Sequence, residues 1–112
     1  MKTKLLIAAA LLSLALPAAA ESSSKQDAYE VSLSQIRLPR IENATIAFKE
    51  CDECEFKTMR VSAETDYRLE GRSVSLKNFR AALEKVVDRE KASVAIIYRL
   101  KDNRVTAISV YL

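Results

Sequence analysis

The chain has 112 residues, of which 49% are hydrophobic and 29% charged, with 18 Lys and Arg against 15 Asp and Glu. It contains no histidine and no tryptophan, and Gly71 is its only glycine. The missing histidine excludes Ser-His-Asp and Cys-His catalysis and histidine-ligated zinc or copper sites, and one glycine cannot build a phosphate-cradling loop.

The N-terminal segment predicts export. Lys2 and Lys4 precede an uncharged apolar run, 5–16, which Pro17 ends before three alanines. This pattern is typical of a secretory signal peptide over residues 1–20. A run of 12 residues is too short for a membrane-spanning helix, which needs about 20. We therefore expect a periplasmic protein, or otherwise a secreted one, whose mature chain does not insert stably into the membrane.

The rest of the chain is expected to consist of a flexible N-terminal lead, 21–40, and one small domain, 41–112. The lead begins ESSSKQDAYE, which is polar and lacks apolar periodicity. Without Lys2 and Lys4 the charges are 16 basic against 15 acidic and are interspersed along the chain. Such a balance gives no electrostatic footprint for DNA or RNA, so no nucleic-acid partner is expected.

Two strands are predicted in the first part of the domain. Residues 44–49 (ATIAFK) and 56–63 (FKTMRVSA) alternate between apolar and other side chains with a period of two. The short connector ECDECE between them favours a hairpin. Cys51 and Cys54 are therefore expected at or beside its tip.

A third strand and a helix are predicted next. The stretch 64–75 (ETDYRLEGRSVS) is expected to fold back at Gly71, because glycine accepts a positive φ. Residues 75–90 predict an amphipathic helix with Ser75 as its N-cap. Its apolar stripe consists of Leu76, Phe79, Leu83, Val86 and Val87.

The C-terminal residues predict a β-hairpin. ASVAIIYRL and VTAISVYL flank KDNR, and a two-residue turn at Asp102-Asn103 would place Leu100 opposite Val105. In that register both faces are largely apolar, so the hairpin is either covered on both sides or available to a partner. We predict a surface for a second copy of the chain or for an envelope protein. Its expected residues are Tyr98, Val105, Val110 and Tyr111.

The predicted order of strand, strand, strand, helix, strand, strand matches the five-stranded oligonucleotide/oligosaccharide-binding (OB) barrel, which has a helix between strands three and four. Over residues 44–112 the chain resembles small exported bacterial domains of this type. The matching positions are Val61, Thr65, Tyr67, Gly71, Val74 and Leu76. The resemblance implies an α+β fold, mostly antiparallel β with about five strands. Because barrels use several glycines to turn corners, an open sheet covered by the helix is the alternative.

The motif ECDEC, 50–54, allows three interpretations. In an oxidising compartment two cysteines favour a disulfide, and the loop-entropy relation gives about 2 kcal/mol for so short a loop. A thiol–disulfide exchanger is disfavoured, because neighbouring carboxylates oppose thiolate formation. A metal site would use Cys51, Cys54, Asp52 and Glu53, although a lone Cys-x-x-Cys is half of a structural zinc site.

The remaining candidates give weaker signals. Glu64 and Asp66 flank Thr65 and could be a carboxylate pair for acid–base catalysis, but solvated charges on a turn are favoured. We therefore expect a non-catalytic binding or interaction module of the cell envelope, without a cofactor. The alternative is a metal- or redox-responsive envelope protein that uses the cysteine pair.

Overall fold

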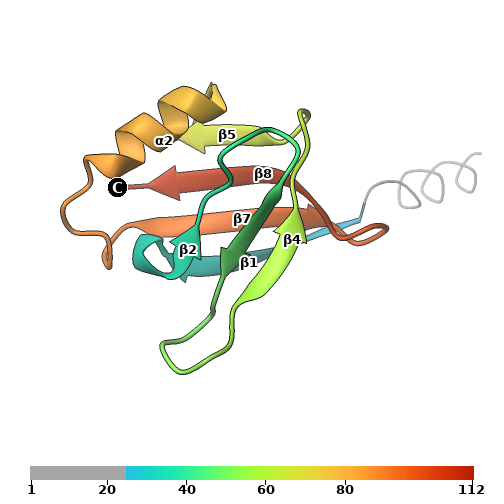
Figure 1. Cartoon of the computed structure of the whole chain (residues 1–112), viewed down its shortest axis with the longest axis horizontal. Helices are drawn as coiled ribbons and strands as arrows, with labels where there is room; N and C mark the ends of the chain where they lie inside the picture. The colour runs from blue at the N-terminus through green and yellow to red at the C-terminus, as the bar shows by residue number, and fades with distance from the viewer. Residues whose placement is uncertain (1–24) are drawn as a thin grey trace, which may run out of the picture.

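The computed structural model describes residues 25–112, and the predicted signal peptide lies outside the described residues. Its elements are β1 (Gln26–Ser32), the 3-10 turn η1 (Leu33–Gln35), β2 (Ile36–Arg37), β3 (Thr45–Phe48), β4 (Lys57–Arg60), β5 (Asp66–Leu69), β6 (Arg72–Val74), α2 (Leu76–Glu84), β7 (Ser93–Arg99) and β8 (Arg104–Tyr111). All eight strands form one sheet in the order β1-β7-β8-β4-β3-β2, with β5 also paired to β8 and β6 to β5 (Figure 1).

The predicted fold class is wrong. We expected about five mostly antiparallel strands and a helix between the third and fourth. The described chain instead has eight strands in a mixed sheet, and its one short helix lies between β6 and β7. The mixed character comes from β8, which is antiparallel to β7 but parallel to both β4 and β5.

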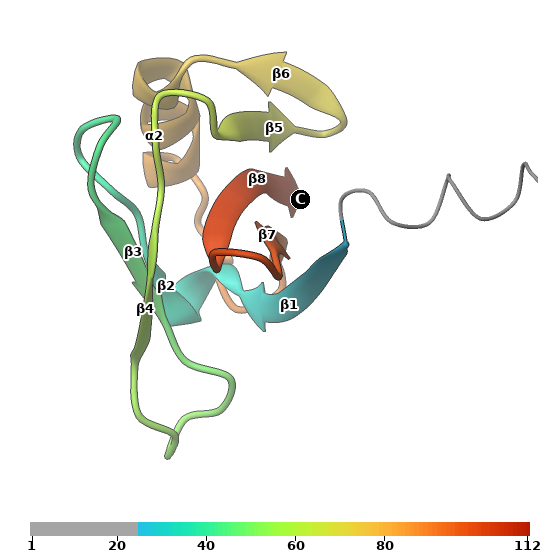
Figure 2. The ribbon, with the colours of Figure 1, turned by 90° about the vertical axis from the view of Figure 1, so that its right-hand side faces the viewer.

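The sheet bends into two layers (Figure 2). The larger layer contains β1, β7, β8, β5 and β6, and the smaller layer contains β2, β3 and β4. Within residues 25–112 their strands pair at one position, Arg60 beside Arg104. Both layers and α2 contribute to a core whose best buried side chains are Leu33, Ile46, Phe48, Val61, Phe79, Leu83, Val94, Ile96, Val105, Ile108 and Val110.

The expected flexible lead is also corrected. Residues 26–32 pair along their whole length with β7, so the domain begins at or before Gln26. Val31, Leu33 and Ile36 are buried in the core. An edge strand with one face on the core needs only alternate apolar side chains. The polar residues between those positions hid the pattern in the sequence.

Both reversals of chain direction that were predicted before the helix are present. β3 and β4 form the expected hairpin, with Phe48 paired to Lys57. The chain folds back between β5 and β6 at Gly71, whose φ is +84°, and at Glu70, whose φ is +53°. Positive φ at both central residues is typical of a tight hairpin turn.

The helix is shorter than predicted. Ser75 caps it as expected, because its side-chain oxygen accepts a hydrogen bond from the Asn78 N–H at 3.1 Å. However, α2 ends at Glu84, and Val87 is 95% exposed. Two adjacent β-branched valines are poor helix formers. The Arg89 side chain donates to the carbonyl of Leu83 at 2.7 Å and so satisfies one group of the last turn.

The C-terminal hairpin forms in a different register from the one predicted. Its loop spans residues 100–103 between paired Arg99 and Arg104, and a bulge lies between Ile97 and Tyr98. Tyr98 therefore lies opposite Val105. The bulge and the longer loop could not be inferred from Asp102-Asn103, because those residues fit several turn lengths.

Thr65 lies at the point where the strand paired with one edge of β8 changes from β4 to β5. β4 pairs at Arg104 and β5 begins to pair at Ala107. Between them, the Thr65 hydroxyl donates to the Val105 carbonyl at 2.8 Å and accepts from the Ser62 N–H at 3.0 Å. Thr65 is buried, so its hydroxyl satisfies backbone groups that water cannot reach.

Replacing that hydroxyl should destabilise the fold. Thr65→Val keeps the shape but leaves the Val105 carbonyl and the Ser62 N–H unpaired, which costs about 1–3 kcal/mol. Chemical denaturation measures the change. The control Thr58→Val alters an exposed position of β4 and should change stability by less than about 0.5 kcal/mol. Equal stabilities of the two variants would contradict this role of Thr65.

Candidate functional site

The predicted Cys51–Cys54 disulfide is present at the end of the first hairpin. It lies in the disulfide loop, 49–56, which extends away from both layers (Figure 2). The two Cα atoms are 5.0 Å apart, and the Cys54 N–H donates to the Cys51 carbonyl at 3.1 Å. Both cysteines are exposed, so the bond closes a surface turn rather than joining distant parts of the core.

The four residues of the possible metal site are not arranged as ligands of one ion. Both sulfurs are bonded to each other, so neither is a thiolate ligand. The Asp52 carboxylate accepts a hydrogen bond from the Gln35 amide at 2.9 Å, while Glu53 is exposed. Within residues 25–112 no group of three or more Cys, Asp or Glu side chains is arranged to hold a metal ion. Metal binding here would require reduction of the pair.

The base of the disulfide loop is held by surface contacts. The Lys57 ammonium donates a hydrogen bond to the Glu50 carboxylate at 2.8 Å, and this contact raises the pKa of Lys57. The Arg37 guanidinium lies 4.3 Å from the centre of the Phe56 ring. Exposed contacts of this kind contribute little individually, so the disulfide is the main constraint on the loop.

The structure separates the four residues of the predicted interaction surface. Val105 and Val110 are 1% and 0% exposed, so both belong to the core and cannot contact a partner. Tyr98 stacks on Tyr29 with 5.2 Å between ring centres. Tyr111 remains 53% exposed. The two-sided apolar pattern therefore reflects burial of both faces of β8, where Ile108 and Val110 are buried on one face and Ala107 on the other.

The carboxylates around Thr65 do not form an acid–base pair. Asp66 accepts a hydrogen bond from Arg68 at 2.7 Å, and this contact lowers the pKa of Asp66. A general acid needs a raised pKa, so Asp66 is unsuited to that role. Glu64 is exposed on the turn.

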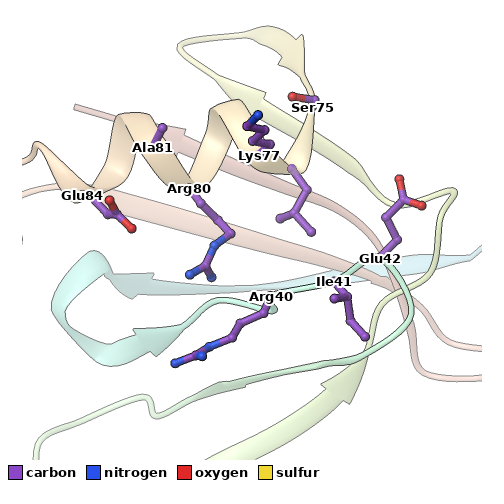
Figure 3. A pocket seen from close by; sticks show the side chains of 9 residues that line it. Arg40, Ile41, Glu42, Ser75, Lys77, Arg80, Ala81 and Glu84 are labelled. Atoms are coloured by element: carbon purple, nitrogen blue, oxygen red, sulfur yellow. The ribbon is translucent and has the colours of Figure 1, made fainter.

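A hollow lies between α2 and the segment that precedes β3 (Figure 3), and no pattern in the sequence predicted it. We call it the helix groove, and its volume is about 610 Å³. It is lined by Arg40, Ile41, Glu42, Ser75, Leu76, Lys77, Arg80, Ala81 and Glu84. No spacing pattern links 40–42 with the helix, because only tertiary packing brings them together.

One hydrogen bond fixes the walls of the helix groove. The Arg80 guanidinium donates to the Pro39 carbonyl at 2.9 Å, and so holds the 39–42 segment beside α2. Ile41 is 64% exposed and contributes an apolar surface. Three cationic side chains line the groove against two carboxylates, and none of the five forms an ion pair within the part of the chain that the structure describes.

A second hollow, of about 370 Å³, lies where the layers meet. We call it the arginine hollow; it is lined by Asn43, Ala44, Thr45, Arg60, Val61, Ser62 and Arg104. Asp102 lies in the adjoining turn, where it accepts hydrogen bonds from Arg99 at 2.7 and 3.1 Å. These bonds, with a further one from the Arg104 N–H, lower the pKa of Asp102 to about 2.

Comparison with models of protein families, with curated proteins and with solved structures gives no match to this chain. Among residues 25–112, α2 is too short and too polar to cross a bilayer.

The disulfide should stabilise the domain modestly. Replacing both cysteines with serine removes the loop constraint, and we expect a loss of about 2 kcal/mol in the free energy of unfolding. Denaturant titration measures it, and the reduced wild-type protein is the matched control because it lacks the same bond. If the double variant were as stable as the oxidised protein, the disulfide would not constrain the unfolded chain.

Acid should weaken the Asp102 contact. Its folded pKa is about 2, below the ordinary value of 3.8, so the unfolded chain takes up this proton first as the pH falls. The stabilisation is present above pH 3.8 and is lost as the pH falls toward 2. The wild-type protein should therefore lose more stability than Asp102→Asn over that range, and carbon-13 NMR should give the carboxyl pKa directly. Titration of Asp102 at its ordinary value would contradict this assignment.

Proposed function

We propose that this protein is an exported, non-catalytic binding module that holds a short acidic-apolar peptide segment of an envelope protein in the helix groove. The observation that carries the proposal is the groove itself. Its volume of about 610 Å³ lies within the roughly 300–1,000 Å³ typical of ligand sites. It combines an apolar surface with charged side chains that have no ion-pair partner within residues 25–112.

The lining favours a segment with alternating apolar and acidic residues. Leu76 and Ile41 offer apolar contacts from the two walls, and Ala81 adds a small apolar side chain to the lining. The three cations exceed the two carboxylates, so a bound segment with net negative charge is favoured over a basic one. Arg80 already holds one wall in place, which reduces the entropy lost on binding.

Export is supported by two independent features. The pattern of residues 1–20 is typical of a signal peptide. The disulfide loop is exposed, and an exposed disulfide persists in an oxidising compartment rather than in a reducing cytoplasm.

Peptide titration tests the binding proposal. The probe is N-acetyl-Leu-Glu-Leu-Glu-amide, followed by nitrogen-15 NMR, with the corresponding Leu-Lys peptide for comparison. The acidic peptide should shift the amides of Ile41, Leu76 and Ala81, and the basic peptide should bind several-fold more weakly. Ala81→Trp should block binding by filling the groove.

The matched control is Asn78→Trp, which adds the same ring at an exposed position of α2 outside the groove lining. It should bind the acidic peptide like the wild-type protein. Equal shifts with both peptides, or unchanged binding by Ala81→Trp, would rule out the helix groove as the site.

A redox-responsive protein is the second candidate, and the exposure of both cysteines supports it because reductants can reach them. Reduction with dithiothreitol discriminates between the two functions. If reduction changes the affinity for the acidic peptide, the disulfide regulates binding. An unchanged affinity leaves the disulfide with a structural role.

A further inference from the structure

Two arginines lie side by side where the two layers meet. Arg60 ends β4 and Arg104 begins β8, and they are direct partners in the parallel pair that joins these strands. Both line the arginine hollow. Like charges on directly opposed strand positions repel each other, and an anion between the two side chains would relieve this repulsion.

The lining of the hollow carries no acidic side chain. Besides the two arginines it contains Asn43, Thr45 and Ser62, which are neutral hydrogen-bonding side chains, and the small apolar Ala44 and Val61. Within residues 25–112 neither Arg60 nor Arg104 forms an ion pair. The adjoining carboxylate, Asp102, is already engaged by two hydrogen bonds from Arg99.

The neutral groups have protons to donate. The Ser62 side-chain oxygen accepts a hydrogen bond from the Glu64 N–H at 3.2 Å, which leaves the Ser62 hydroxyl hydrogen free to donate. Thr45 lies at an exposed position of β3 beside Arg60, its direct partner in β4. The hollow therefore offers two guanidinium groups and two hydroxyls, which are donors suited to oxygen anions.

We propose that the arginine hollow binds a phosphoryl group, with Arg60 and Arg104 on opposite sides of its oxygens. Guanidinium groups bind phosphate through paired, charge-assisted hydrogen bonds. A phosphate monoester carries close to two negative charges at neutral pH, which matches two arginines better than the single charge of a carboxylate. The Thr45 and Ser62 hydroxyls reach the remaining oxygens.

The backbone around the hollow is rigidly built. The Val61 N–H donates to the Ala44 carbonyl at 2.9 Å, and the Ser62 N–H donates to the buried Thr65 side chain. Arg60 and Ser62 are therefore positioned by the turn that connects β4 to β5. This site uses different residues from the helix groove, so either proposal can fail without the other.

Titration with inorganic phosphate at pH 8, followed by nitrogen-15 NMR, tests the proposal. Phosphate should shift the amides of Thr45, Ser62 and Arg104, whereas sodium chloride at equal ionic strength should not. Arg60→Gln and Arg104→Gln should each weaken binding about tenfold or more, because each removes charge-assisted hydrogen bonds. Arg72→Gln, which removes the same charge from exposed β6, should bind within about twofold of wild type.

Vesicles identify the source of the phosphoryl group. Phosphatidylcholine vesicles with and without phosphatidic acid are compared by sedimentation of the wild-type protein and the two arginine variants. Arginine-dependent binding to phosphatidic acid assigns a lipid headgroup, and binding to inorganic phosphate alone assigns a small soluble phosphate. Either result supports the site. Equal shifts with chloride, or phosphate binding that survives in the Arg60→Gln/Arg104→Gln double variant, would overturn it.

Discussion

The fold depends on how one edge of β8 is shared by two strands that follow each other in the chain. β4 and β5 run in the same direction along that edge, and the turn 61–65 between them interrupts the backbone hydrogen bonds. The Thr65 side chain replaces a backbone group there, since its hydroxyl bonds to the Val105 carbonyl. A single side chain thereby lets the sheet bend into two layers without leaving the interrupted edge unpaired.

The bend determines where the two hollows lie. It brings the segment before β3 to the end of the molecule occupied by α2, where 40–42 forms the helix groove. The next residues, 43–45, line the arginine hollow at the junction of the layers. One connecting segment thus contributes to both hollows. The disulfide loop lies at the far end of β3 and β4 (Figure 2), and none of its residues lines either hollow.

Local patterns were predictable from the sequence, whereas the pairing of distant strands was not. The tip position of Cys51 and Cys54, the turn at Gly71 and the Ser75 cap all follow from contacts between residues close in the chain. The fold class was wrong because the parallel partners of β8 lie about 40 residues away from it, and no local periodicity specifies such pairing. For the same reason the sequence did not indicate that Arg60 and Arg104 lie together, because each alone resembles an ordinary surface charge.

Long-range nuclear Overhauser effects in the oxidised protein test the central claim most directly. If β8 carries β4 and β5 in tandem, parallel-strand contacts should join Arg60 to Arg104 and Tyr67 to Ile108 in one spectrum. Contacts from Arg60 but none from Tyr67, or an antiparallel pattern between β5 and β8, would show that the edge of β8 is not shared in this way. The bend, and both hollows with it, would then need a different origin.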